Sequence, residues 1–228
     1  MKCQDARWEI ITASGLLPPL FDLPSRVPDI FKAFYFALES DFPLDLTGME
    51  SQGSTRYSDL KLVLDVEGGK IHCELSPAIL LNHFRLTGKD ALPRIKKFGR
   101  LYEAAVRRVF PDMVISDRVY RLHAWVNLEE GGKEAAVRLL SARGGKALGL
   151  RGESFKDMEK DFTIRADLKG KQQNVSYMLQ KSAIEVGHLY IETAVQFLGG
   201  TDRSDPDANY EELLKRFAEI KQELGFDA

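Results

Sequence analysis

Cysteine is scarce in this sequence, with only Cys3 and Cys73 among 228 residues. A disulfide framework or a structural zinc site needs several cysteines at short, paired spacings, and no such pattern is present. Two isolated thiols are typical of a protein in a reducing compartment. We therefore expect a cytoplasmic protein without disulfides.

Long apolar runs are missing as well. Charged residues interrupt the apolar stretches within about ten residues, whereas a membrane-spanning helix needs about 20. The first nine residues include Lys2, Asp5, Arg7 and Glu9, where a signal peptide would need an apolar core. We expect no membrane span and no membrane partner.

The sequence does contain enough apolar material to fold, since 44% of its residues are hydrophobic and 29% are charged. Both fractions are close to the averages for globular proteins, and the mixture argues against a disordered chain. A chain of this length fits one large domain or two small ones. We predict a single α+β domain over residues 1–228, with a two-lobed organisation divided near residues 112–117 as the alternative.

Hydrophobic periodicity predicts helices and strands in mixed order. We expect helices over 28–42, 90–110, 134–142 and 206–224, and strands over 8–13, 60–67, 70–76, 118–128 and 162–168. Residues 78–86 fit either a strand or a helical turn. Residues 174–198 fit either a helix or a β-hairpin, and their β-branched residues favour the hairpin. Tight hairpins favour a mostly antiparallel β-sheet with helices packed on it, and no repeat at a solenoid period is visible.

The hairpin predicted at Gly68-Gly69 also carries a register prediction. If these two glycines form the turn, Leu64 lies opposite Cys73 and Asp65 lies opposite His72. Cys73 is then a core residue and no nucleophile. Asp65 and His72 form either an exposed ion pair or a carboxylate that orients an imidazole for base chemistry.

Charge is segregated along the chain although the net charge is only −2. Residues 1–84 hold 7 Lys/Arg against 12 Asp/Glu, residues 85–171 hold 20 against 12, and residues 172–228 hold 5 against 10. The central segment is therefore basic, with a net charge of +8, between two acidic segments. This order is compatible with an anion-binding centre, with a self-neutralising fold, or with a contact between copies.

Three groups of side chains in the central segment could contact an anion or a nucleic acid. They lie on the outer face of helix 90–110, on one face of strand 118–128, and in the glycine-rich segment 143–151. The candidate residues are Lys96, Arg100, Arg107, Arg121, Trp125, Arg143, Lys146 and Arg151. Solvated helix and loop surfaces have the same composition, and a second layer of structure could bury Trp125.

No motif in the sequence is specific enough to identify a catalysed reaction. Gly144-Gly145-Lys146 lacks the upstream glycine of a phosphate-binding loop, and the four histidines have no metal-ligand spacing. We therefore predict no catalytic residue, metal or cofactor. The leading hypothesis is a non-catalytic binding or adaptor protein that engages a protein partner or its own copy through an exposed sheet or basic helix face. The alternatives are a nucleic-acid-binding module that uses the basic segment and an enzyme that acts on a phosphate-containing substrate at 143–151.

Overall fold

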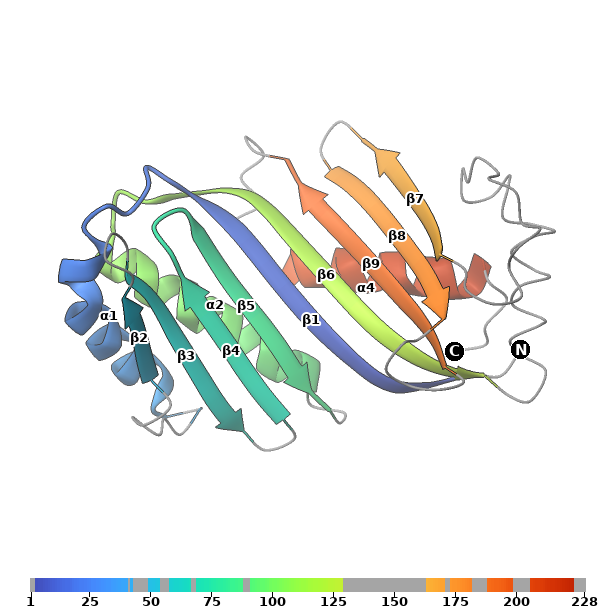
Figure 1. Cartoon of the computed structure of the whole chain (residues 1–228), viewed down its shortest axis with the longest axis horizontal. Helices are drawn as coiled ribbons and strands as arrows, with labels where there is room; N and C mark the ends of the chain where they lie inside the picture. The colour runs from blue at the N-terminus through green and yellow to red at the C-terminus, as the bar shows by residue number, and fades with distance from the viewer. Residues whose placement is uncertain are drawn as a thin grey trace. The chain divides into compact units, whose positions relative to one another are not determined.

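The computed structural model describes residues 3–40, 42, 49–53, 58–66, 69–87, 91–128, 163–170, 173–181, 188–198 and 206–223. Within them lie three helices, α1 (Leu23–Leu38), α2 (Ala91–Val109) and α4 (Pro206–Glu223). The strands are β1 (Cys3–Leu17), β2 (Met49–Gly53), β3 (Ser58–Val66), β4 (Gly69–Leu75), β5 (Ile79–Leu86), β6 (Val114–Leu128), β7 (Thr163–Lys169), β8 (Gln173–Lys181) and β9 (His188–Phe197). The pairings given for these strands are antiparallel, and helices pack on them, so the predicted α+β class is confirmed (Figure 1).

The chain divides into two compact units. The N-terminal unit comprises residues 10–119 and 198–208, and the C-terminal unit comprises residues 1–9, 120–197 and 209–228. Strands β1 and β6 run through both units, because the divisions fall inside them. The number of independently folding domains stays a prediction.

In the N-terminal unit the strands lie in the order β2-β3-β4-β5-β1, and α1 and α2 cover one face of them (Figure 1). Alternate strand residues are buried, as period-two patterning requires. They include Leu62, Cys73 and Phe84, which confirms Cys73 as a core residue. Aromatic rings fill the space below the helices: the Phe98 ring lies 5.3 Å from Phe42, 5.8 Å from Phe84 and 6.0 Å from Tyr102 between centroids.

The predicted hairpin register is wrong by two residues. Leu64 pairs with Ile71, and His72 lies opposite Val63. Asp65 instead lies opposite Lys70, with 3.1 Å between its Oδ1 and the lysine Nζ. The turn therefore comes before Gly69, which pairs with Val66 as the first residue of β4. A shift of two residues keeps every side chain on its predicted face, so the alternating pattern could not distinguish the two registers.

Helix α1 begins earlier than predicted, at Leu23, and holds Pro28 inside it. Pro24 occupies the first turn, where a missing N–H is tolerated. The aromatic residues of α1 are only partly buried, since Phe34 is fully buried whereas Tyr35 is 37% exposed. The apolar pattern before Pro28 was overlooked because a proline is expected near a helix start.

In the C-terminal unit the strands lie in the order β6-β9-β8-β7, and α4 covers one face of them (Figure 1). The Tyr120 ring packs edge-on against Tyr210 of α4 at 5.0 Å and against Phe197 at 5.7 Å. Residues 174–198 contain the β8–β9 hairpin, as predicted, and 78–86 contain strand β5. The predicted helix 134–142 lies outside the described residues.

The two units repeat one order of neighbouring strands. In the N-terminal unit the neighbours are β3-β4-β5-β1, and in the C-terminal unit they are β7-β8-β9-β6. In each case the strand that comes first in the chain lies beside the last strand of a three-strand meander, and a helix follows that last strand. The repeat was invisible to the sequence analysis because it is a repeat of topology.

Candidate functional site

Two cations on the predicted basic face of α2 are paired with acidic side chains. Arg100 Nη1 lies 3.1 Å from Asp207 Oδ2, and Arg107 Nη2 lies 3.0 Å from Glu103 Oε1. Lys96 is half-buried on the same helix. The cations of this helix therefore present less positive potential than the sequence suggests.

Arg118 adds a second guanidinium to the carboxylate of Glu103. Its two terminal nitrogens donate to the two oxygens of Glu103, each at 2.8 Å. The side chains are only 9% and 13% exposed, respectively. This bidentate geometry is characteristic of a strong, charge-assisted pair that fixes β6 against α2 inside the N-terminal unit.

Arg121 and Trp125, two of the other candidate residues, do not lie in the same unit as α2. Arg121 is exposed on β6, and Trp125 is 5% exposed, both in the C-terminal unit. The Trp125 ring lies 5.3 Å from the Tyr190 ring, so it packs as a buried aromatic. Arg143, Lys146 and Arg151 lie outside the described part of the chain.

A polar cluster lies beside Trp125 in the C-terminal unit. Tyr190 donates its hydroxyl to Glu192 Oε2 at 3.2 Å, and His123 Nε2 lies 3.8 Å from the same oxygen. Burial, together with the charge of Glu192, raises the pKa of Tyr190 far above its ordinary value. The phenol therefore stays protonated and acts as a donor, so it is unsuited to the role of a general base.

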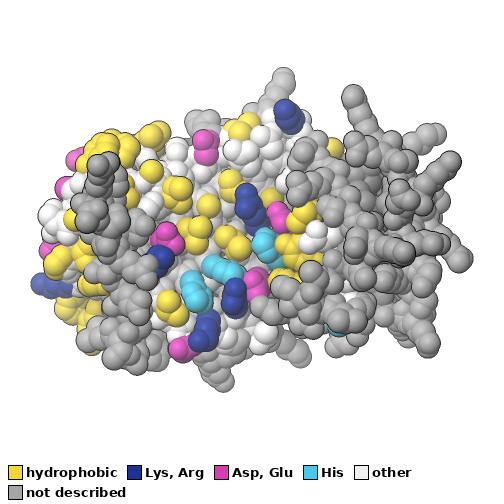
Figure 2. Space-filling model, in the orientation of Figure 1, with side chains coloured by type: hydrophobic (Ala, Val, Ile, Leu, Met, Phe, Trp, Pro, Cys, Tyr) yellow, Lys and Arg dark blue, Asp and Glu magenta, His cyan; other side chains and the backbone are white. Residues whose placement is uncertain are grey.

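A second polar cluster lies on the face of the N-terminal sheet that α1 and α2 leave uncovered. His72 and His83 are opposite each other on β4 and β5, with ring centroids 6.0 Å apart. Arg85 donates from Nε to His83 Nε2 at 3.4 Å. Burial, then His83, Arg85 and Lys70, lower the pKa of His72, so its imidazole is neutral at neutral pH. Figure 2 shows histidines gathered with Lys and Arg side chains on this face.

Neither cluster is a metal centre in the described ranges. Within them, no group of three or more His, Cys, Asp or Glu side chains is placed to hold a metal ion. Cationic neighbours such as Lys70 and Arg85 also disfavour a metal ion beside the His72–His83 pair.

The described helices include none long and apolar enough to cross a membrane.

Exposed apolar side chains gather at one end of the N-terminal unit. They come from the end of β1 and the chain after it, from the β4–β5 connection, and from the first residues of β5 and β6. We call them the apolar end: Leu17, Pro18, Phe21, Ala78, Ile79 and Val114. Leu17 is 54% exposed, Phe21 70%, Ile79 47% and Val114 60%.

Backbone hydrogen bonds hold the segments of the apolar end together. Leu16 N–H donates to the carbonyl of Ala78 at 2.9 Å, and Leu20 N–H donates to that of Pro77 at 2.6 Å. Ser116 of β6 lies beside Gly15 of β1, since a Cβ built on Gly15 would be 2.5 Å from the serine Oγ. The backbone segments that carry the exposed side chains are therefore hydrogen-bonded to one another or in close contact.

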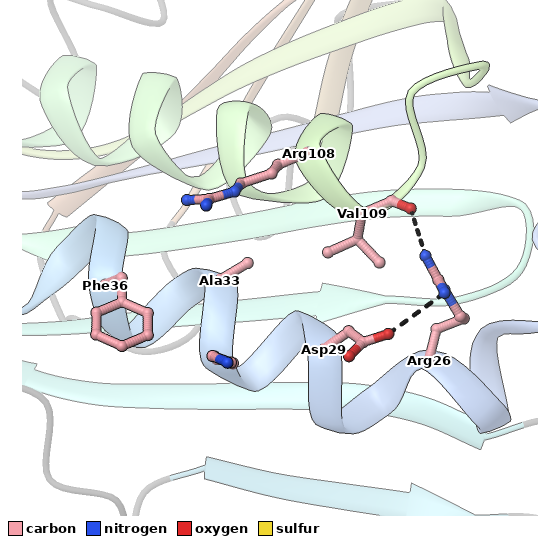
Figure 3. A pocket seen from close by; sticks show the side chains of 7 residues that line it. Arg26, Asp29, Ala33, Phe36, Arg108 and Val109 are labelled. Atoms are coloured by element: carbon pink, nitrogen blue, oxygen red, sulfur yellow. Dashed lines mark hydrogen bonds and ion pairs between the residues drawn. The ribbon is translucent and has the colours of Figure 1, made fainter.

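A groove of about 310 Å³ lies between α1 and α2 (Figure 3). Its lining residues are Arg26, Asp29, Lys32, Ala33, Phe36, Arg108 and Val109. Arg26 closes one end, because its Nη2 donates to the carbonyl of Val109 at 3.0 Å and its Nη1 lies 3.3 Å from Asp29 Oδ2. Sequence analysis missed this groove because its two walls are about 80 residues apart in the chain.

No family model and no curated protein matches this chain. Among solved structures, it is similar to a Bacillus halodurans protein described as a "putative adenylate cyclase". That likeness has 9% sequence identity and a TM-score of 0.18, and it covers 92% of this chain and 75% of the other. At this TM-score it supports no conclusion about fold or activity.

Proposed function

We propose that this chain is a non-catalytic binding protein that contacts a protein surface through the apolar end, and that its partner is a second copy of the chain. The observation that supports the proposal most directly is the exposure of Leu17, Phe21, Ile79 and Val114, each between 47% and 70%. Single exposed apolar residues are ordinary on a monomer, but a contiguous group is typical of a protein interface.

The backbone of the apolar end suits it to this role. The hydrogen bonds to Ala78 and Pro77 hold the end of β1, the chain after it and the β4–β5 connection together, so little order has to be gained on contact. Aromatic and aliphatic anchors of this kind contribute most of the binding energy at interfaces.

The adjoining sheet face favours a second copy as the partner. Ile79 shares its face of β5 with Leu81 and His83, and this face carries both charge signs in neighbouring positions. Lys61 lies opposite Glu74, and Asp65 opposite Lys70. A surface with interspersed charges of both signs can be self-complementary across a two-fold axis.

Two pairings disfavour the nucleic-acid alternative. Arg107 and Arg118 share the one carboxylate of Glu103, and Arg100 is paired with Asp207, so two negative charges offset these three cations in part. Nucleic-acid affinity depends on cations that replace counterions along phosphates. The enzyme alternative depends on residues 143–151, which lie outside the described ranges. A cytoplasmic location likewise stays a prediction.

Sedimentation velocity between about 5 and 200 µM tests the proposal, since a contact with a Kd of tens of micromolar becomes populated in this range. We expect the mass to rise from the 25.7 kDa of one chain toward twice that value. Phe21→Ser with Ile79→Thr should keep the chain monomeric. Leu168→Thr is the matched control, because Leu168 is 44% exposed on β7. A wild-type chain that stays monomeric at about 200 µM would contradict the proposal.

A further inference from the structure

The groove between α1 and α2 has an apolar floor and an aromatic wall. Ala33 and Val109 are 8% and 7% exposed, and they form the floor. Phe36 is 57% exposed on α1, although burial of a phenylalanine side chain is favourable. Arg26, Asp29, Ala33 and Phe36 recur at helical spacing, so a single stripe of α1 builds this wall.

Cations outnumber acids in the lining. Arg26, Lys32 and Arg108 face one carboxylate, Asp29, which is already engaged by Arg26. Arg26 also covers the negative end of α2 through its bond to the Val109 carbonyl. In the described part of the chain, Lys32 and Arg108 make no hydrogen bond or ion pair. Figure 3 shows Arg108 extending from the last turn of α2 along the groove on the side where Phe36 lies.

A further donor is unsatisfied. The Nε of Arg26 is buried and has no hydrogen-bond partner among the described residues. Buried donors are almost always paired, with protein groups, ordered water or a ligand. The Nε of Arg26 therefore adds to the excess of donors over acceptors in the lining.

We propose that this groove binds a small amphipathic anion, an aromatic ring that carries a phosphate, sulfonate or carboxylate. The ring packs against Phe36 and the apolar floor, and the anionic group lies between Lys32 and Arg108. The volume of about 310 Å³ is at the lower end of the range for small-molecule pockets, which suits a single-ring ligand. None of the lining residues belongs to the apolar end, so this site stands or falls independently of the proposed self-association.

A ¹H–¹⁵N correlation titration with phenyl phosphate to about 10 mM tests the site, because so small a ligand binds weakly. We expect saturable shifts of amides in α1 and the last turn of α2. Inorganic phosphate and benzyl alcohol, which each supply half of the chemistry, should bind at least about tenfold more weakly. Raising the salt concentration should weaken phenyl phosphate binding.

Lys32→Glu with Arg108→Glu should abolish the shifts without unfolding the chain, since both side chains are exposed and make no contact that the fold requires. Lys215→Glu, an equivalent charge reversal on an exposed position of α4, should leave them unchanged. Absence of shifts in α1 and α2 overturns the proposal. So does binding that survives the double reversal, or inorganic phosphate that binds as tightly as phenyl phosphate.

Discussion

Removing the carboxylate of Glu103 is expected to be among the most destabilising single changes on α2. Glu103→Ala takes two 2.8 Å hydrogen bonds away from the guanidinium of Arg118, whose side chain is 9% exposed. Breaking one partner out of a buried pair costs about 3–5 kcal/mol, because the remaining charge stays desolvated. The partial exposure of both side chains places the expected loss at the lower end, about 3 kcal/mol.

Thermal unfolding followed by circular dichroism measures this loss. For a chain of this size each kcal/mol shifts Tm by about 2–4 °C, so Glu103→Ala should unfold about 6–12 °C below wild type. Arg107→Ala is the control: it removes an ion pair whose arginine is 42% exposed, and it should change stability by less than about 1 kcal/mol.

A double variant separates the loss of attraction from the cost of keeping a buried charge that has lost two hydrogen bonds. Glu103→Leu with Arg118→Leu removes both charges and should recover most of the stability, because apolar residues of similar size replace buried pairs without a large loss. If Glu103→Ala unfolds at the wild-type temperature, or no lower than Arg107→Ala, then the carboxylate of Glu103 does not stabilise the buried Arg118 guanidinium.

Three further changes test the core, the first residue of a strand and a titration. Phe98→Ala removes a ring that is fully buried among other aromatic rings, and it should lower the free energy of unfolding by about 3–5 kcal/mol in urea. Gly69→Ala should cost at least about 2 kcal/mol in the same assay, because Gly69 has φ +153° and its Cβ would lie 1.7 Å from the Arg85 carbonyl oxygen. His72 binds its proton less readily in the folded chain than at its ordinary pKa of 6.5, so the unfolded state gains protons first as the pH falls. Stability should therefore decline below about pH 6.5, and by less in His72→Asn, when both are unfolded in urea across pH 7.5–5.5.

Local patterning predicted most of the elements. Alternation on β3 and β4 identified the buried face of their hairpin, including Cys73, because strand side chains alternate with a period of two. The stripes of α2 and α4 were equally clear. The register of the β3–β4 hairpin was not, since pairings that differ by two residues bury the same side chains.

The candidate surfaces could be predicted from the sequence much less well than the helices and strands. Eight residues were predicted to bind an anion or a nucleic acid, and the structure pairs Arg100 and Arg107 with acids and buries Trp125. The partner of Arg100 lies more than 100 residues away along the chain, so no local pattern could reveal it. The apolar end and the groove likewise combine segments that are distant in sequence.

The sequence by itself determined most of the helices and strands and the buried face of the β3–β4 hairpin, because both follow from the periodicity of apolar residues along a short segment. Tertiary structure alone decided which charges are neutralised, where Leu17, Phe21, Ile79 and Val114 gather, and that Lys32 and Arg108 line one groove. These features depend on which distant segments pack together. That packing fixes the distances between charges and the burial of each side chain.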